Sequence, residues 1–282
     1  MNLLIICGDH KRNQASIEYI KKIKYINIVK IFIFKRDNDL PKPPKRLNKK
    51  IKQLWRLHFK KRKVSEDKNF KFLVDKNFEK EKIQYLNKIE DIFKFKKFIK
   101  NNKIDCCFIS GIPVLSKKIL NILPEYIVNL HLGLIPDYKG SITNFWPFLF
   151  LEPTMVGTTY HFINKEIENK NNKVDTGEIL HNNVPKLKIG DSMHDVSTRA
   201  LLTAIKDIHL VMRYVNSRIK KKLKPNYDNS IISKGKLFLA SDWKPEMLQF
   251  IYGTYKDKIV DLYLKNKIVC KKPKLKKITN FK

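Results

Sequence analysis

Short apolar runs alternate with helical spacing along the first half of the chain, and this alternation predicts an α/β fold. The run 2–7 ends at Gly8, which is typical of a buried strand entering a turn. Repeated strand–helix–strand units predict a doubly wound, mainly parallel sheet, and the absence of G-x-G-x-x-G leaves a dinucleotide site without support. The expected strands are 2–7, 26–34, 104–110 and 126–132, with helices around 15–23, 89–100 and 115–121.

The second half of the chain predicts fewer strands and one long helix. Extended stretches are expected at 157–163, 178–184 and 236–240, and helical spacing runs from about 193 to 223. The basic stretch 265–282 is expected to be a small appendage with a loose tail. We therefore predict an α/β domain over 1–190, a helical connection over 191–234 and a small C-terminal appendage over 235–282.

An interruption follows the second expected strand. Residues 35–50 carry three prolines and many charges, which is typical of a loop. Residues 51–63 then place Ile51, Trp55 and His58 on one helical face and basic residues on much of the rest. Such a helix can dock on an anionic surface or membrane. The pattern favours the plainer interpretation, in which the apolar face packs on the domain and the lysines are solvated.

The charge of the chain is extreme, with 59 Lys and Arg against 27 Asp and Glu and a formal net charge of +32. Such an excess attracts polyanions, including nucleic acid, nucleotide diphosphates and anionic membranes. The excess is nearly all lysine, and isoleucine and asparagine are abundant too, which favours a compositional bias of the source genome. Charge alone therefore identifies no partner.

The cysteines and the N-terminus predict a cytoplasmic protein. Cys7, Cys106, Cys107 and Cys270 show neither metal-ligand spacing nor a disulfide framework, so we expect reduced thiols and no metal site. The first residues do not form a signal peptide, because Asp9, His10 and Lys11 follow the apolar run directly. No apolar run is long enough for a transmembrane helix.

Two polar residues share a face at the end of an expected strand. Asn129 and His131 are two positions apart, so their side chains point the same way from a strand. Open parallel sheets carry their chemistry at the carboxyl ends of strands, which makes this a candidate site. Taken alone, the two residues are equally compatible with capping of backbone groups.

Three motifs follow one another in order and change this balance. The segment from Asn129 to Gly140 has the pattern N-x-H-x-x-x-x-P-x-x-x-G, residues 157–161 have G-x-T-x-H, and residues 175–180 have D-x-G-x-I-L. This series resembles the folate-dependent formyltransferases, a family that includes glycinamide ribonucleotide, methionyl-tRNA and sugar N-formyltransferases. The resemblance extends from about residue 87 to residue 187. It implies a Rossmann-like formyltransferase fold with its catalytic domain over 1–190.

By this resemblance the catalytic residues are Asn129, His131 and Asp175, and the formyl donor is 10-formyltetrahydrofolate. Carboxamide and imidazolium N–H groups can donate to the developing oxyanion, and each such donor contributes about 3–4 kcal/mol. A carboxylate near the histidine can hold the imidazole charged and accept a proton. The resemblance also implies that the folate lies against residues of two loops: Ser110, Gly111, Ile112, Val114, Leu115 and Gly177.

The chain departs from the family pattern at two places. The family often has serine at the position of Gly133. A polar insertion also precedes Asp175, and it puts the geometry of the folate pocket in doubt and offers Glu166 and Glu168 as weaker rivals for the acid. His161 is expected to be a packed or hydrogen-bonded strand residue rather than a catalytic one. The same plain interpretation applies to His10, His58, His181 and His194.

The acceptor amine is less well defined. Tyr138, Lys139 and Trp146 are candidate acceptor contacts by resemblance, although a core tryptophan fits equally well. The segment after Gly140 resembles sugar-acting members, which favours a nucleotide-linked amino sugar whose diphosphate is held by Lys or Arg. Methionyl-tRNA is the alternative, favoured by the charge but opposed by the short C-terminal segment. An inactive polyanion-binding module is a weaker alternative, and a homodimer is compatible with the resemblance.

Overall fold

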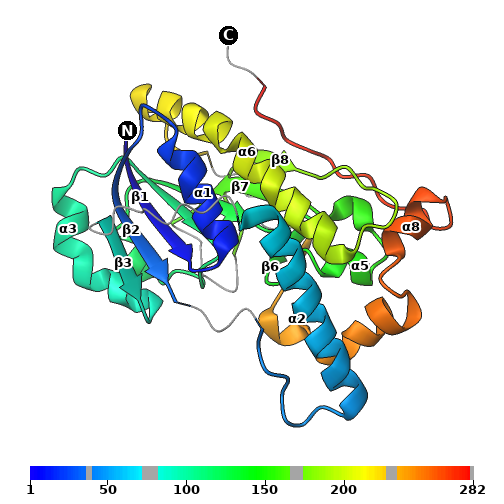
Figure 1. The fold of residues 1–282 in the computed structure, drawn as a ribbon. Coiled ribbons are helices and arrows are strands. Elements are labelled where there is room, and N and C mark those ends of the chain that lie inside the picture. Colours follow the sequence, from blue (N-terminus) through cyan, green and yellow to red (C-terminus); the bar gives the residue numbers. More distant parts are fainter. Residues whose placement is uncertain (36–39, 72–81, 166–173, 227–233, 280–282) are drawn as a thin grey trace.

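The computed structural model describes residues 1–35, 40–71, 82–165, 174–226 and 234–279. Within these residues the apolar runs form one seven-stranded sheet in the order β3-β2-β1-β4-β5-β7-β8 (Figure 1). The first five of these strands are parallel, whereas β7 is antiparallel to both β5 and β8. The predicted doubly wound, mainly parallel α/β fold is confirmed. The strands are β1 (Asn2–Gly8), β2 (Asn27–Phe34), β3 (Ile83–Leu86), β4 (Cys106–Ser110), β5 (Tyr126–His131), β7 (Thr158–Phe162) and β8 (Ile179–Asn183).

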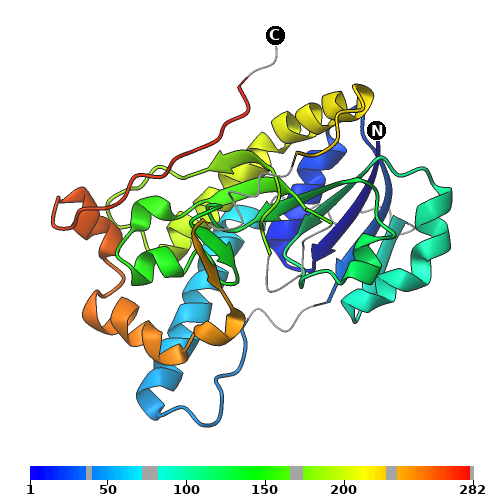
Figure 2. The same cartoon turned by 180° about the vertical axis from the view of Figure 1, so that it is seen from behind.

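Alternate residues of β1 face two separate layers of helices (Figures 1 and 2). Leu3 and Ile5 belong to a core shared with α1 (Lys11–Lys21) and α6 (Met193–Lys220). Leu4 and Ile6 belong to a core on the opposite face, formed with η2 (Ile89–Phe95), α3 (Lys96–Asn101) and α4 (Lys117–Leu120). This division follows from the two-residue period of a strand. It explains why β1 is apolar throughout, since both of its faces are buried.

Helix α2 (Lys49–Phe70) is longer than the predicted helix 51–63. It begins where the side chain of Asn48 accepts a hydrogen bond from the Ile51 N–H at 2.9 Å. It continues past residue 63 because Ser65 and Phe70 are buried, and Ser65 contacts the first turn of α6. The apolar face packs on the protein, as expected, with Ile51 and His58 buried.

The C-terminal segment does not form a core of its own. Strand β9 (Lys236–Phe238) pairs in parallel with β6 (Tyr138–Gly140), and one apolar cluster joins this pair to α2 and α5 (Trp146–Leu149). The division at residues 190 and 234 stays a prediction, but the third segment shares its core with the first. The remaining short elements are η3 (Pro153–Met155), η4 (Ala240–Asp242), η5 (Pro245–Met247), the π-helical η6 (Gln249–Thr254) and α8 (Ile259–Leu264).

The expectation of a loose tail is wrong for its described part. The N–H of Asn182 in β8 donates to the carbonyl of Lys276 at 2.8 Å, and the Lys276 N–H donates to the Asn182 side chain at 2.8 Å. The Ile278 N–H donates to Nδ1 of His181 at 2.9 Å. These bonds hold the tail along the outer edge of β8, where an unpaired strand edge would otherwise face solvent.

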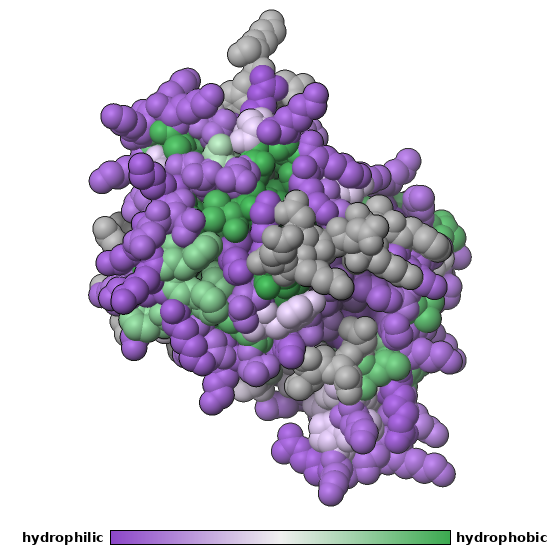
Figure 3. Space-filling view, turned by 60° about the vertical axis from the view of Figure 1, so that its left-hand side comes forward, coloured by the Kyte–Doolittle hydropathy of each residue, from purple (hydrophilic) through white to green (hydrophobic). Residues whose placement is uncertain are grey.

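The lysine excess lies largely at the surface. Figure 3 shows one face of the molecule, on which hydrophilic side chains predominate and apolar patches lie between them. None of the described helices is both long enough and apolar enough to cross a membrane.

Candidate active site

The structure brings the three predicted catalytic residues together. Asn129 and His131 lie on β5 at its carboxyl end, and Asp175 lies in the segment before β8. Nδ1 of His131 is 3.4 Å from Oδ2 of Asp175. His161 on β7 joins them, because its Nε2 is 3.5 Å from Oδ1 of Asp175. Glu166 and Glu168, the rival acids, lie outside the described residues.

Close backbone contacts hold Asp175 in position. The N–H of Gly140 donates to Oδ2 of Asp175 at 2.8 Å. Asp175 itself has a φ of 54°, a left-handed conformation that aspartate tolerates better than most residues. At Gly177, a Cβ atom would stand 1.7 Å from the carbonyl oxygen of Phe162, so only glycine fits there. The D-x-G motif therefore encodes a turn that packs directly on β7.

Both ring nitrogens of His131 face oxygen atoms. Nε2 is 2.9 Å from the carbonyl oxygen of Tyr138, while Nδ1 faces Asp175. A neutral imidazole can donate to one of these oxygens, and an imidazolium can donate to both. Burial lowers the pKa of His131 below its usual value, although the Asp175 charge and the Tyr138 carbonyl act in the opposite direction. The structure therefore favours neutral His131 near pH 7, rather than the imidazolium expected from the sequence.

Gly133 leaves room for His131. A Cβ atom at this position would lie 2.6 Å from Nε2 of His131 and 2.7 Å from the carbonyl oxygen of Tyr138. A side chain here would press on both partners of the same hydrogen bond. The close approach of His131 thus explains why this chain has glycine at a position where formyltransferases often have serine.

Asp175 is ionised at neutral pH. Burial alone would raise the pKa of the carboxyl group, but His131, His161 and the Gly140 N–H together lower it to about 2. Asp175 is therefore a proton acceptor beside a neutral imidazole, and the two groups can exchange a proton.

His161 orients the side chain of Asn129. The two residues are register partners on β5 and β7, and Nδ2 of Asn129 is 2.9 Å from Nε2 of His161. Nδ1 of His161 lies 2.9 Å from the carbonyl of Phe162, which fits a donor at Nδ1 and an acceptor at Nε2. His161 is a hydrogen-bonded strand residue, as expected, but the sequence interpretation did not place it beside Asn129 and Asp175. Its place in the G-x-T-x-H motif was the one indication that it belongs to the site.

Five of the six predicted folate-binding residues lie at or just after the end of the neighbouring strand β4, and the sixth, Gly177, lies in the turn that follows Asp175. Ser110 ends β4, which is paired with β5, and its hydroxyl donates to Oδ1 of Asn13 at 3.0 Å. Gly111 has a φ of 62° and also approaches Asn13. The sequence did not predict that Asn13 would contact these residues. Its only indication was a polar side chain in the first turn of a helix. Of the remaining predicted contacts, Val114 is exposed, Leu115 is buried, and Ile112 packs on the core below α4.

The three predicted acceptor contacts have different surroundings. Lys139 is buried near Asp175, and burial lowers its pKa although the Asp175 charge opposes this. Tyr138 points the other way from β6, and its hydroxyl donates to Glu152 at 2.5 Å. Trp146 is only 3% exposed and its indole N–H donates to the Ser141 carbonyl at 3.0 Å. Trp146 thus packs in the core, as one of the two interpretations of the sequence expected, and an acceptor contact by this residue stays a prediction.

Within the described residues, no group of three or more His, Cys, Asp and Glu side chains could hold a metal ion. The prediction that the site uses no metal stays a prediction.

Comparison with known proteins gives a match at the level of structure. No protein-family model matches the chain, and no curated protein matches it by sequence. A sugar N-formyltransferase from a Shewanella species matches with a TM-score of 0.50 and 14% identity, over 86% of this chain and 78% of that one. Phosphoribosylglycinamide formyltransferase from Anaplasma phagocytophilum matches with a TM-score of 0.50 and 13% identity, over 85% of this chain and 98% of that one. The chain therefore has the fold of the formyltransferases.

Proposed function

We propose that this protein transfers a formyl group from 10-formyltetrahydrofolate to a primary amine, and that this amine is carried by a nucleotide-linked amino sugar. One observation carries the proposal. Asn129, His131 and Asp175 lie in one cluster at the carboxyl end of β5, within the fold of the formyltransferases. These are the three residues that the motifs single out, and their chemistry suits amine formylation.

The carboxamide and the imidazole supply hydrogen-bond donors. Attack of the amine nitrogen on the formyl carbon creates a tetrahedral intermediate with a negatively charged oxygen. Asn129 is half-buried, and one Nδ2 hydrogen points to His161, so the other is left to donate to this oxygen. An N–H of His131 is a second donor when the ring turns from a protein oxygen to the intermediate. Removing such a donor costs about 3–4 kcal/mol of transition-state stabilisation.

Asp175 and His131 move the protons. The attacking nitrogen gives up a proton as the new C–N bond forms, and ionised Asp175 accepts it directly or through a water molecule. Neutral His131 can then accept this proton from Asp175, because its Nδ1 lies 3.4 Å from Oδ2 of the carboxylate. The bond between the formyl carbon and the folate nitrogen then breaks, and that nitrogen is protonated. The balance is one amine proton transferred to the leaving folate, with no covalent enzyme intermediate.

A tRNA acceptor is the second candidate, because the net charge of +32 favours a polyanionic substrate. The amino-sugar acceptor is preferred because the segment that follows Gly140 resembles that of the sugar-acting members.

The test is tetrahydrofolate release from 10-formyltetrahydrofolate with three kinds of acceptor: nucleoside diphosphate amino sugars, methionyl-tRNA and glycinamide ribonucleotide. Asp175→Asn is expected to lower kcat at least about a hundredfold with the fold retained. Asp207→Asn is the matched control, since Asp207 also faces a histidine, His181, at 3.2 Å but lies outside the cluster. Near-normal turnover by Asp175→Asn would remove this residue from the mechanism. Absence of transfer to every acceptor would refute the proposed function.

A further inference from the structure

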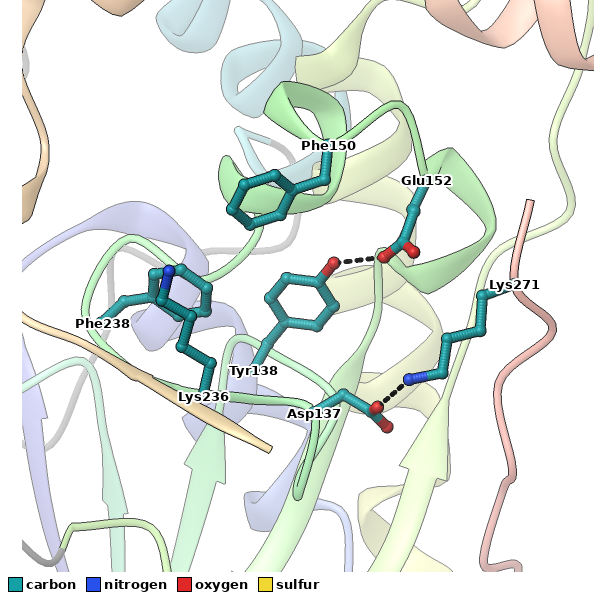
Figure 4. A pocket seen from close by; sticks show the side chains of 7 residues that line it. All are labelled: Asp137, Tyr138, Phe150, Glu152, Lys236, Phe238 and Lys271. Atoms are coloured by element: carbon teal, nitrogen blue, oxygen red, sulfur yellow. Dashed lines mark hydrogen bonds and ion pairs between the residues drawn. The ribbon is translucent and has the colours of Figure 1, made fainter. Parts of the chain in front are cut away.

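A shallow pocket of about 110 Å³ adjoins β6 and is lined by Tyr138 of this strand (Figure 4). Tyr138 and Lys139 are consecutive in β6, so their side chains leave the strand on opposite sides. Lys139 is on the side of Asp175, and Tyr138 enters the pocket. The pocket residues come from three separate parts of the chain: Asp137, Tyr138, Phe150, Glu152, Lys236, Phe238 and Lys271.

Aromatic rings form one wall of this pocket. The ring of Tyr138 stacks on Phe238 with centroids 5.7 Å apart and an interplanar angle of 11°. Phe238 in turn stacks on Trp146 at 4.7 Å and 16°. The residues of this stack are buried, whereas Phe150, which stacks on Trp146 at 6.5 Å and 23°, is 45% exposed. Part of the Phe150 ring can therefore be reached by a planar ligand.

The mouth of the pocket carries two carboxylates and two lysines. The ammonium group of Lys271 forms an ion pair with Asp137, and Glu152 accepts the hydroxyl hydrogen of Tyr138. Both carboxylates thus have protein donors. The ammonium of Lys236 lies over the rings of Phe150 and Phe238, at 5.7 and 5.2 Å from their centroids. A cation held by ring faces alone can turn to a phosphate at little cost.

We propose that this pocket binds the nucleotide half of the acceptor, with the base on Phe150 and the diphosphate between Lys236 and Lys271. A planar ring joined to a polyanion satisfies both the aromatic wall and the two lysines. This inference rests on the proposed function for its substrate. The pocket and the catalytic cluster share β6, because the carbonyl of Tyr138 contacts Nε2 of His131 at 2.9 Å. A substrate that reaches around the edge of this strand can contact both.

The test is calorimetric titration of the full chain with UDP, dTDP and, as a probe without a base, inorganic pyrophosphate. Phe150→Ala and Lys236→Gln are each expected to weaken nucleoside diphosphate binding about tenfold or more, since stacking of a base on one aromatic ring has roughly this effect. Pyrophosphate binding should respond to Lys236→Gln but hardly to Phe150→Ala. The distinction separates recognition of a nucleotide from recognition of phosphate alone.

Matched controls come from the opposite edge of the sheet. Tyr85 on β3 is 52% exposed and carries the ammonium of Lys35 at 5.7 Å from its ring, which repeats the lysine–aromatic pair of the pocket. Tyr85→Ala and Lys35→Gln should leave nucleotide binding unchanged. Equal losses from the pocket variants and from these controls would mean that general surface charge, and not the pocket, binds nucleotides.

Turnover separates this inference from the proposed function. If the protein formylates a nucleotide-linked amino sugar, Phe150→Ala should raise KM about tenfold with kcat nearly unchanged. A KM and a nucleotide Kd within twofold of the wild-type values in both pocket variants would overturn the inference while leaving the function intact. Nucleotide binding that depends on Phe150, without formyl transfer to any amine, would support the pocket and refute the function. Failure of the wild-type protein to bind either nucleotide would overturn the pocket proposal.

Discussion

Replacing His58 by asparagine is expected to make the stability of the protein less sensitive to acid. His58 on α2 and His194 on α6 are both buried, with ring centroids 4.5 Å apart. Both contact the hydroxyl of Tyr252, at 2.9 and 3.2 Å. Burial, assisted by the charge of Arg62, lowers the pKa of His58 from its usual 6.5 to about 3. Burial also lowers the pKa of His194 well below its usual value.

The sign and size of the effect follow from proton linkage. Between pH 6.5 and about 3 the unfolded chain protonates residue 58 and the folded protein does not, so the free energy of unfolding falls as the pH falls. Above pH 6.5 the contribution is constant. One such histidine gives a slope of about 1.4 kcal/mol per pH unit, or about 2 kcal/mol between pH 6.5 and 5.0. His194 acts in the same direction.

The assay is urea unfolding, followed by tryptophan fluorescence and circular dichroism, at several pH values from 7.5 to 5.0. Asparagine keeps a polar atom near the position of Nδ1, which contacts Tyr252. His58→Asn is expected to be destabilised at pH 7.5, yet to lose about 1.4 kcal/mol less per pH unit below pH 6.5. His209→Asn is the control, because His209 is an exposed residue of α6. Parallel stability curves for the wild type and His58→Asn would refute the reasoning.

Two further predictions concern the catalytic cluster. Gly133→Ala is expected to lower kcat about tenfold or more while the protein stays folded, because the added Cβ would press on His131 and the Tyr138 carbonyl. Circular dichroism and turnover measured together check this prediction, and an unchanged kcat would contradict it. His161→Ala is expected to lower kcat because Asn129 loses the partner that orients its side chain. His161→Gln can still accept a hydrogen bond from Nδ2 of Asn129 and should recover part of the loss. Equal activity of the two variants would exclude an orienting role for His161.

The sequence predicted the main sheet because its strands are buried on one or both faces. The expected strands coincide with β1, β2, β4, β5, β7 and β8 to within about two residues at most ends, and the long helix begins at Met193 as expected. Strand β3 was missed. It has four residues at the edge of the sheet, and one of them, Tyr85, is exposed, so it carries no continuous apolar run.

The local sequence pattern could not predict that the C-terminal segment packs against β6. Strands β6 and β9 have three residues each and are far apart in sequence. Segments this short show no alternation of apolar and polar residues from which their pairing could be predicted. Their contact also decides the position of Trp146, which stacks on Phe238 of β9 and is thereby removed from the surface. An aromatic residue near a site has no local signal that separates a core position from a substrate contact.

The position of His161 depends on strand register. Asn129 and His161 meet because β5 and β7 pair antiparallel with these residues opposite each other. Sequence spacing does not reveal this register, since a shift by one residue would turn His161 to the other face of the sheet. The plain interpretation of a strand histidine was therefore reasonable locally, and only the sheet shows that its partners are Asn129 and Asp175.

The glycines of the motifs explain why three separated segments make one site. Gly140 allows β6 to approach β9, since a Cβ there would lie 2.2 Å from the carbonyl oxygen of Phe238, and its N–H holds the Asp175 carboxylate. Gly177 allows the Asp175 turn to lie against β7. The positions of the proposed catalytic side chains thus depend on close backbone approaches that larger residues would prevent. The glycines of the motifs therefore mark positions where two backbone segments must come close, and this requirement explains why the motif spacing can be recognised at 13–14% identity to solved structures.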